Sequence, residues 1–199
     1  LTYDSPFKVI GYTVDTAYLN QEKKNGLPIF SFETLETHFT PDEVNLLIPI
    51  GSTNINGLRK ARYDQAKARG YSFVSYVSSR ATVWSNQAIG ENTMIYDKSL
   101  IEAYATIGNN CIVRSNVNIS HHAKVDNHCF IATSVIIGGR AQINQLCFLG
   151  LGSIVINKIL AAKTFVGAGA LVTKDTEENG LYIGSPARLQ TKRANEVKL

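Results

Sequence analysis

The chain has 199 residues, of which 44% are hydrophobic and 18% charged, and its net charge is +4. These values are ordinary for a globular protein of one or two small domains. No apolar run approaches the ~18 residues of a membrane span, no signal peptide opens the sequence, and basic residues are not interleaved with aromatic ones. We therefore expect a cytoplasmic protein with no membrane span and no nucleic-acid partner.

Residues 1–78 have the pattern of an α/β domain. Apolar stretches predict three strands, over residues 7–15, 44–51 and 72–77. Capping and turn residues predict two helices between them, over residues 32–39 and about 55–69. A Rossmann-like sheet normally opens with a strand and a Gly-rich turn, so the first βα unit is expected to be absent from this sequence.

Three residues follow the first two expected strands. Asp15 comes at the end of the first, and Gly51 and Ser52 come after the second. Open α/β sheets bind ligands at the carboxyl ends of their strands, which makes these residues candidates for ligand contact. Asp after a strand and Gly-Ser in a loop are also frequent turn chemistry, so both readings stay open.

Residues 79–199 carry a repeat with a period of six. Thirteen apolar residues follow one another at six-residue intervals: Val83, Ile89, Ile95, Ile101, Ile107, Val113, Ile119, Val125, Ile131, Ile137, Ile143, Leu149 and Val155. A helix repeats at 3.6 residues and a half-buried strand at 2, so this period predicts a parallel β-helix. Three hexapeptides make one coil, and coils stack at ~4.8 Å. The next apolar residue is Leu160, five residues on, which predicts a one-residue deletion at a corner.

Cysteines and glycines refine this picture. Cys111, Cys129 and Cys147 are spaced by eighteen residues, so they should form one column of buried thiols on successive coils. Glycine directly follows several of the buried residues, as at Gly90 and Gly108. We expect these glycines to provide the positive φ that a corner needs.

Two adjacent histidines are the candidate catalytic residues. His121 lies two residues after Ile119, so it should point away from the core near a corner, with His122 beside it. Histidine is the side chain best suited to proton transfer near neutral pH, although an exposed histidine without a role is equally common. A zinc site would need three converging imidazoles, whereas His122 and His128 should face different ways and His38 lies outside the repeat. We expect no metal.

The chain resembles the sialic-acid-type sugar O-acyltransferase family, which includes nucleotide-amino-sugar N-acetyltransferases. The resemblance rests on the strand ending in Asp at 12–15, the loop at 50–51, the segment 81–83, the histidine-bearing coil, and the motifs GAGALVTKD at 167–175 and GSPAR at 184–188. It implies a Rossmann-like nucleotide-sugar-binding domain over 1–78 and a β-helix acyltransferase domain with a C-terminal tail over 79–199. The left hand of that β-helix is implied by the resemblance alone, since the general crossover rule favours the other hand.

The resemblance also implies a function. It points to an acetyl-CoA-dependent acetyltransferase of a nucleotide-linked amino sugar, with N-acetylation favoured over O-acetylation. His121 would be the general base, with His122 where relatives often carry Glu. Asp15, Gly51 and Ser52 would contact the sugar nucleotide. The acetyl-CoA groove would be lined by Phe130, which replaces a second histidine of relatives, and by Leu151, Gly152, Gly167, Ala168, Gly169, Lys174 and Arg188.

Flat β-helix faces rich in apolar and small residues suggest a homotrimer with His121 near a subunit boundary. The groove glycines could instead reflect corner geometry alone. Two other functions stay open. One is a non-catalytic scaffold, in which the changes at His122 and Phe130 record lost activity. The other, less favoured, is a metalloenzyme of the carbonic-anhydrase-like hexapeptide type.

Overall fold

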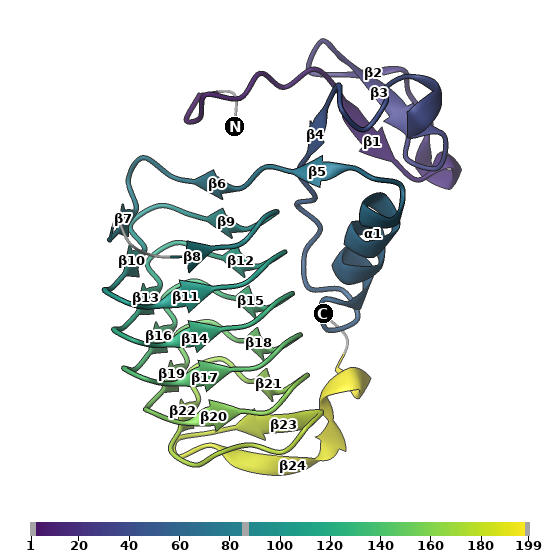
Figure 1. Ribbon diagram of the computed structural model, residues 1–199. Coiled ribbons are helices and arrows are strands. Elements are labelled where there is room, and N and C mark those ends of the chain that lie inside the picture. Colours follow the sequence, from purple (N-terminus) through teal and green to yellow (C-terminus); the bar gives the residue numbers. More distant parts are fainter. Residues whose placement is uncertain (1–2, 85–87, 198–199) are drawn as a thin grey trace.

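The computed structural model describes residues 3–84 and 88–197. A small N-terminal α/β part sits over one end of a tall parallel β-helix, and the last strands close the other end (Figure 1). The elements of the N-terminal part are β1 (Tyr12–Val14), η1 (Thr16–Tyr18), β2 (Lys23–Lys24), β3 (Leu27–Ser31), η2 (Leu35–Thr37), β4 (Asn45–Leu46), α1 (Gly57–Ala68) and β5 (Ser72–Phe73).

The N-terminal strands form two small sheets. β1 pairs in parallel with β3, β2 pairs antiparallel with β3, and β4 pairs in parallel with β5. Their shared core contains the buried side chains of Phe32, Leu35, Tyr63, Tyr71 and Phe73. The predicted strands over 7–15 and 44–51 shrink to β1 and β4, because each finds a partner strand over only a few residues.

The predicted helix over 32–39 is wrong. Strand β3 occupies residues up to Ser31, and only the short η2 follows. The Ser31 hydroxyl does not cap a helix, because it is hydrogen-bonded to Thr16 Oγ1 at 2.6 Å and to Glu33. The second predicted helix is confirmed as α1, but it begins two residues late, since Asn54, Ile55 and Asn56 all have positive φ.

The β-helix has three faces, each a sheet of stacked short strands. The first face contains β7 (Thr82–Val83), β10 (Leu100–Ile101), β13 (Asn118–Ile119), β16 (Ile136–Ile137), β19 (Ile154–Val155) and β22 (Leu171–Val172). The second contains β8 (Ala88–Ile89), β11 (Thr106–Ile107), β14 (Lys124–Val125), β17 (Gln142–Ile143) and β20 (Ile159–Leu160). The third contains β6 (Tyr76–Val77), β9 (Met94–Ile95), β12 (Ile112–Val113), β15 (Phe130–Ile131), β18 (Phe148–Leu149), β21 (Phe165–Val166), β23 (Gly180–Ile183) and β24 (Arg188–Arg193), and η3 (Ala194–Glu196) follows.

The coil register agrees with the sequence period. From Ile95 on, the apolar residues of the series lie in the core with at most 2% of their surface exposed. Paired strands step by eighteen residues until Ile143 pairs with Leu160, seventeen residues on, which confirms the predicted deletion. The three cysteines are buried and free. The boundary after residue 78 stays a prediction, since β6 already stacks on β9.

The expectation for the glycines is wrong. Among the residues that directly follow a buried strand residue, Gly90 and Gly150 do not have positive φ. They are needed because the next coil passes too close: a Cβ on Gly90 would lie 2.4 Å from the backbone of Gly108, and one on Gly150 would lie 2.7 Å from the nitrogen of Ala168. The left-handed conformation falls two residues after each such position, and mostly polar residues adopt it: Asn92, Lys98, Tyr104, Asn110, Asn116, His122, His128, Ser134, Arg140 and Leu146.

Helix α1 lies along the flank of the β-helix (Figure 1). The side chain of Arg59 is fully buried there, and its partners among the described residues are backbone carbonyls rather than carboxylates. It donates to the carbonyl oxygens of Asn110 at 3.1 Å, His128 at 2.9 Å and Gly51 at 2.7 Å, and burial lowers the pKa of Arg59 to about 10. The Asn56 amide reaches the next coil, at the carbonyl of Cys147 (3.1 Å). One turn of helix therefore holds three successive coils.

A ladder of buried polar side chains runs beside this contact. Asn92 donates to Asn110 at 2.7 Å, and Asn110 bonds to Nδ1 of His128 at 2.8 Å. The backbone N–H of Ile48 donates to Asn92 at 2.7 Å, which ties the ladder to the N-terminal part. Burial lowers the pKa of His128 to about 4, so the imidazole is neutral and Nδ1 acts as the acceptor.

Candidate active site

The histidine pair occupies a corner between the first and second faces. β13 directs Ile119 into the core, and the chain returns to the core at Ala123, so His121 and His122 project outward at the turn between them. Both His121 and His122 are exposed, as predicted. His122 holds the left-handed conformation of the corner, with a φ of 59°.

The imidazole of His121 is held on several sides. Its Nδ1 lies 3.2 Å from Nδ1 of His122, and the His122 ring packs against Tyr104 with centroids 4.8 Å apart. A Cβ on Gly139 would lie 2.7 Å from Cε1 and Nε2 of His121, so the bare glycine makes room for the ring. Among the described residues, Nε2 has no hydrogen-bond partner. This nitrogen is therefore free to accept a proton from a bound molecule.

The backbone of His121 is also anchored. Its N–H donates to Oε2 of Glu102 at 2.9 Å, and its carbonyl accepts from the N–H of Arg140 at 3.0 Å. Sequence reasoning missed Glu102 and Gly139. Both could have been found from the coil length of eighteen residues, because Gly139 lies eighteen residues after His121 and Glu102 lies eighteen before Ser120.

Most residues of the expected acetyl-CoA groove gather at the other edge of the first face. Leu151 and Gly152 lie at the corner between β18 and β19, and the carbonyl of Leu151 accepts the N–H of Gly169 at 2.8 Å. Gly167 and Ala168 precede Gly169 in that next coil. Leu151 is 60% exposed, and Gly152 and Gly169 have φ values of 63° and 66°. Corner geometry therefore explains these two glycines.

Two cations and one aromatic residue complete the expected set. Lys174 and Arg188 are both exposed, after β22 and at the start of β24. Phe130 stands apart from His121, on the third face. Its ring stacks on Phe148 with centroids 5.4 Å apart, and Phe148 stacks on Phe165 at 4.4 Å. This stack of phenylalanine rings is covered by Ile55 from the N-terminal part and Ala194 from the C-terminal part.

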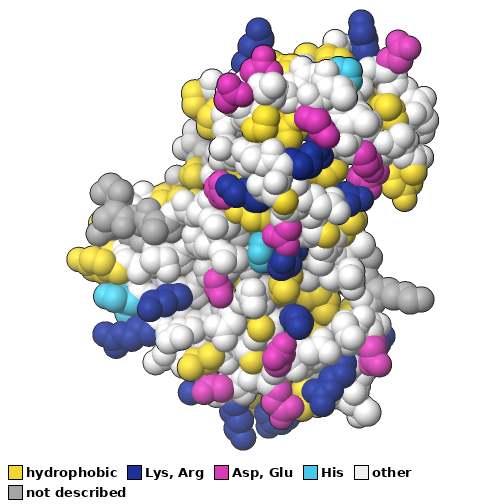
Figure 2. Space-filling model, turned by 45° about the vertical axis from the view of Figure 1, so that its right-hand side comes forward, with side chains coloured by type: hydrophobic (Ala, Val, Ile, Leu, Met, Phe, Trp, Pro, Cys, Tyr) yellow, Lys and Arg dark blue, Asp and Glu magenta, His cyan; other side chains and the backbone are white. Residues whose placement is uncertain are grey.

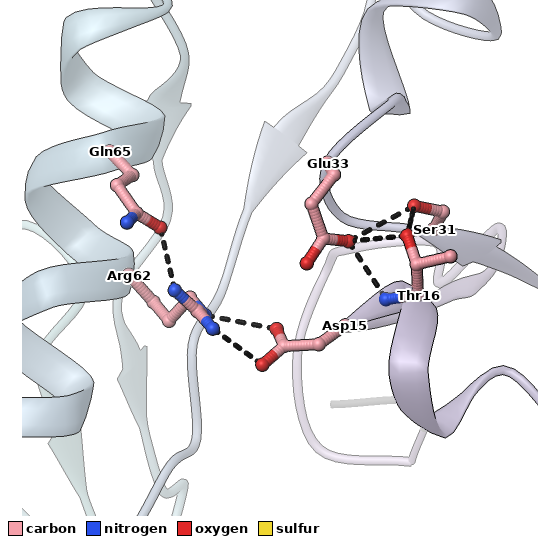
Figure 3. A network of polar contacts seen from close by, with 6 residues as sticks. All are labelled: Asp15, Thr16, Ser31, Glu33, Arg62 and Gln65. Carbon is pink, nitrogen blue, oxygen red and sulfur yellow. Dashed lines mark hydrogen bonds and ion pairs between the residues drawn. The ribbon is translucent and has the colours of Figure 1, made fainter.

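The expected substrate residues of the N-terminal part contact α1 or its N-cap, and Figure 3 shows the contact of Asp15. Asp15 accepts two hydrogen bonds from Arg62, at 2.9 and 2.5 Å, and the carbonyl of Gly51 accepts from Arg59. Ser52 accepts the N–H of Asn56 through its carbonyl at 3.0 Å. The structure thus brings Asp15 and Gly51 to neighbouring turns of one helix, which the sequence did not predict.

A second carboxylate lies beside Asp15. Glu33 accepts the N–H and the hydroxyl of Thr16, both at 2.8 Å, and the hydroxyl of Ser31 at 3.1 Å (Figure 3). These hydrogen bonds lower the pKa of Glu33 to about 2. On the face that carries α1, cationic and acidic side chains are interspersed (Figure 2). The region therefore combines the carboxylates of Asp15 and Glu33 with the guanidinium of Arg62.

Within residues 3–84 and 88–197, no cluster of three His, Cys, Asp or Glu side chains is arranged to hold a metal ion. No helix of that part of the chain is long and apolar enough to cross a membrane.

Comparison with solved structures reveals the same architecture in known enzymes. The acetyltransferase domain of PglB from Neisseria gonorrhoeae superposes with a TM-score of 0.81 at 20% identity, covering 90% of this chain and 86% of that one. The chain has an acetyltransferase fold. The same domain in complex with acetyl coenzyme A gives a TM-score of 0.78 at 20% identity, covering 85% and 82% of the two chains.

A third structure with this fold contains two bound ligands. A variant of perosamine N-acetyltransferase from Caulobacter crescentus, in complex with CoA and GDP-perosamine, matches with a TM-score of 0.74 at 24% identity. The match covers 84% of this chain and 79% of that one. No family model and no curated protein matches the sequence.

Proposed function

We propose that the protein is an acetyl-CoA-dependent acetyltransferase that acts on a nucleotide-linked amino sugar. The observation that carries the proposal is that the likeness to acetyltransferases spans 84–90% of the chain, including both of its parts. The crystallised relatives bind acetyl coenzyme A in one case, and CoA with GDP-perosamine in another. N-acetylation is favoured over O-acetylation, because the sugar of the second complex is acetylated on nitrogen according to its enzyme name.

His121 acts as the general base of the proposed reaction. The sugar amine attacks the thioester carbonyl carbon, and Nε2 of His121 takes the proton that the amine loses as the new C–N bond forms. The tetrahedral intermediate then collapses with cleavage of the C–S bond, and CoA leaves as its thiol after taking up a proton. His122 holds the base through the contact between the two Nδ1 atoms, which leaves Nε2 without a hydrogen-bond partner among the described residues.

The remaining residues bind the two substrates. Acetyl-CoA lies along the corner where small residues allow a close approach and where exposed cations can meet its phosphates. That set consists of Leu151, Gly152, Gly167, Ala168, Gly169, Lys174 and Arg188, with Phe130 added from another face. Asp15, Gly51 and Ser52 contact the nucleotide sugar in the N-terminal part, for which we retain a Rossmann-like description. That the β-helix is left-handed is part of the same proposal.

A homotrimer would bring these groups together across subunits. Outward side chains of the first face are in register and largely apolar, and they lie between the His121 corner and the Leu151 corner: Leu100, Ile136, Ile154 and Leu171. Ile136 is 43% exposed, so this row adds apolar surface to the face. A second copy packed on this face would place its groove residues beside the histidine pair.

The three free thiols agree with a reducing compartment, the cytoplasm.

A thiol-release assay tests the proposed function. Purified protein is mixed with acetyl-CoA and a panel of nucleotide amino sugars, and the CoA thiol is measured with a chromogenic disulfide. We expect His121→Ala to lower turnover about 100-fold or more, as removal of a general base does. His38→Ala, which removes an exposed imidazole outside the β-helix, is the matched control and should retain activity. Full turnover by His121→Ala would refute the role of the base, and acetyl-CoA binding without turnover on any sugar would favour a scaffold.

A further inference from the structure

We propose that Glu102 is a positioning residue that supplies the negative charge of the active site to His121. The inference rests on the proposed function, since it assigns a partner to the proposed base. An imidazole that takes up a proton becomes a cation, and a nearby carboxylate stabilises that cation. The residue that follows His121 is a second imidazole, which carries no fixed negative charge. A carboxylate that offsets the imidazolium would therefore come from another coil.

The fold places Glu102 where it can act. Residue 102 is on the coil that precedes the histidines, and its backbone N–H donates to the carbonyl of Ile119 at 2.9 Å, which fixes its position in the stack. Its carboxylate is half-buried and accepts the N–H of His121 at 2.9 Å. The negative charge is thus bonded to the same residue whose ring would become positive.

Glu102 differs in charge from the other charged and titratable groups at this corner. They come from three coils: Tyr104, His122, Lys124 and Arg140. Lys124 and Arg140 are cations, so both oppose protonation of a neighbouring imidazole. Among the described residues of these three coils that border the corner, Glu102 is the one carboxylate that offsets them. Within the described part of this corner, the negative charge that offsets the two cations therefore comes from a single side chain.

A structural role and an electrostatic role predict different results. Glu102→Gln keeps an oxygen that can accept the His121 N–H but removes the charge. Glu102→Ala removes both, and Glu102→Asp keeps the charge on a shorter side chain. The matched control is Asp126→Asn. Asp126 is an exposed carboxylate that also accepts a backbone N–H, that of Asn127 at 2.7 Å. It lies in the same coil as His121 but at a different corner.

The decisive measurement is the pH dependence of kcat/KM. Loss of the charge makes protonation of the base harder, so the acid limb of the profile should move to lower pH in Glu102→Gln, with kcat reduced about tenfold and KM for acetyl-CoA little changed. Glu102→Asp should restore most of the activity, and Asp126→Asn should have the wild-type profile. A Glu102→Gln profile that coincides with that of wild type would overturn the proposal, as would equal shifts in both amide variants.

A readout that needs no turnover separates this inference from the proposed function. The ring proton of His121 is followed by NMR as the pH is varied, in substrate-free wild type, Glu102→Gln and Asp126→Asn. We expect the titration to move to lower pH in Glu102→Gln only. If the protein shows no activity on any sugar and this shift still occurs, the proposed function fails while the assignment of Glu102 to the histidine stands. If turnover is present and the titration does not move, Glu102 is a structural residue only.

Discussion

Acidification should weaken the protein through one buried histidine, His128. Its pKa falls from the ordinary 6.5 to about 4, mainly because burial disfavours the charged form. Between these two values the unfolded chain binds a proton that the folded chain does not, so acid favours unfolding. This contribution is fully retained above pH 6.5, is lost progressively as the pH falls, and levels off below about pH 4. Each pKa unit corresponds to about 1.4 kcal/mol, so the loss is about 3 kcal/mol.

A single substitution isolates this contribution. His128→Asn removes the titrating ring, keeps an oxygen that can accept from Asn110, and suits a left-handed position whose φ is 64°. It also loses the edge contact between His128 and Tyr63, whose ring centroids are 5.6 Å apart, at a cost of about 1 kcal/mol. We therefore expect the variant to be about 1 kcal/mol less stable than wild type at pH 7 and about 2 kcal/mol more stable at pH 4.

The assay is urea unfolding followed by far-UV circular dichroism at several pH values from 7 to 4. Other carboxylates and histidines titrate in both proteins, so only the difference between the two unfolding free energies is compared. His38→Asn, which removes an imidazole outside the β-helix, is the control for the loss of any histidine. Parallel stability curves for wild type and His128→Asn would show that the buried neutral imidazole is not responsible for the acid sensitivity.

Two further substitutions test the docking of α1 and the space around the base. Arg59→Met should lower the free energy of unfolding by about 3 kcal/mol or more, because several buried carbonyls lose their donor, whereas Lys60→Met beside it should cost little. Equal midpoints in thermal unfolding would contradict this account. Gly139→Ala should lower kcat at least about tenfold by displacing the His121 ring while leaving the unfolding midpoint near that of wild type. Unchanged kcat would show that the ring does not need this space.

The β-helix was predictable in detail because each residue of the period repeats the same physical requirement. Core positions, the column of cysteines and the deletion before Leu160 all follow from counting. The N-terminal part was predicted poorly because its strands are short and are stabilised by pairing with other segments rather than by local propensity. β3 contains Pro28, and local propensity gave no indication that this segment would pair with two other strands.

The candidate site was predictable only in part. The histidine pair could be found from its offset to Ile119, since the offset alone decides that the side chains leave the core. Glu102 and Gly139 belong to other coils, and finding them requires the coil length as well as the period. The contact between Asp15 and Arg62 joins residues forty-seven positions apart, which no local pattern encodes.

Helix α1 changes how the β-helix should respond to force and heat. In a solenoid each coil contacts only its neighbours, so coils can be lost one at a time from an end. Here one helical turn bonds three coils, through Arg59 to the carbonyls of Asn110 and His128 and through Asn56 to that of Cys147. These coils cannot separate individually while the helix stays bound. The middle of the β-helix, including the coil that carries His121, therefore forms one cooperative unit that should exchange its amide protons last and together.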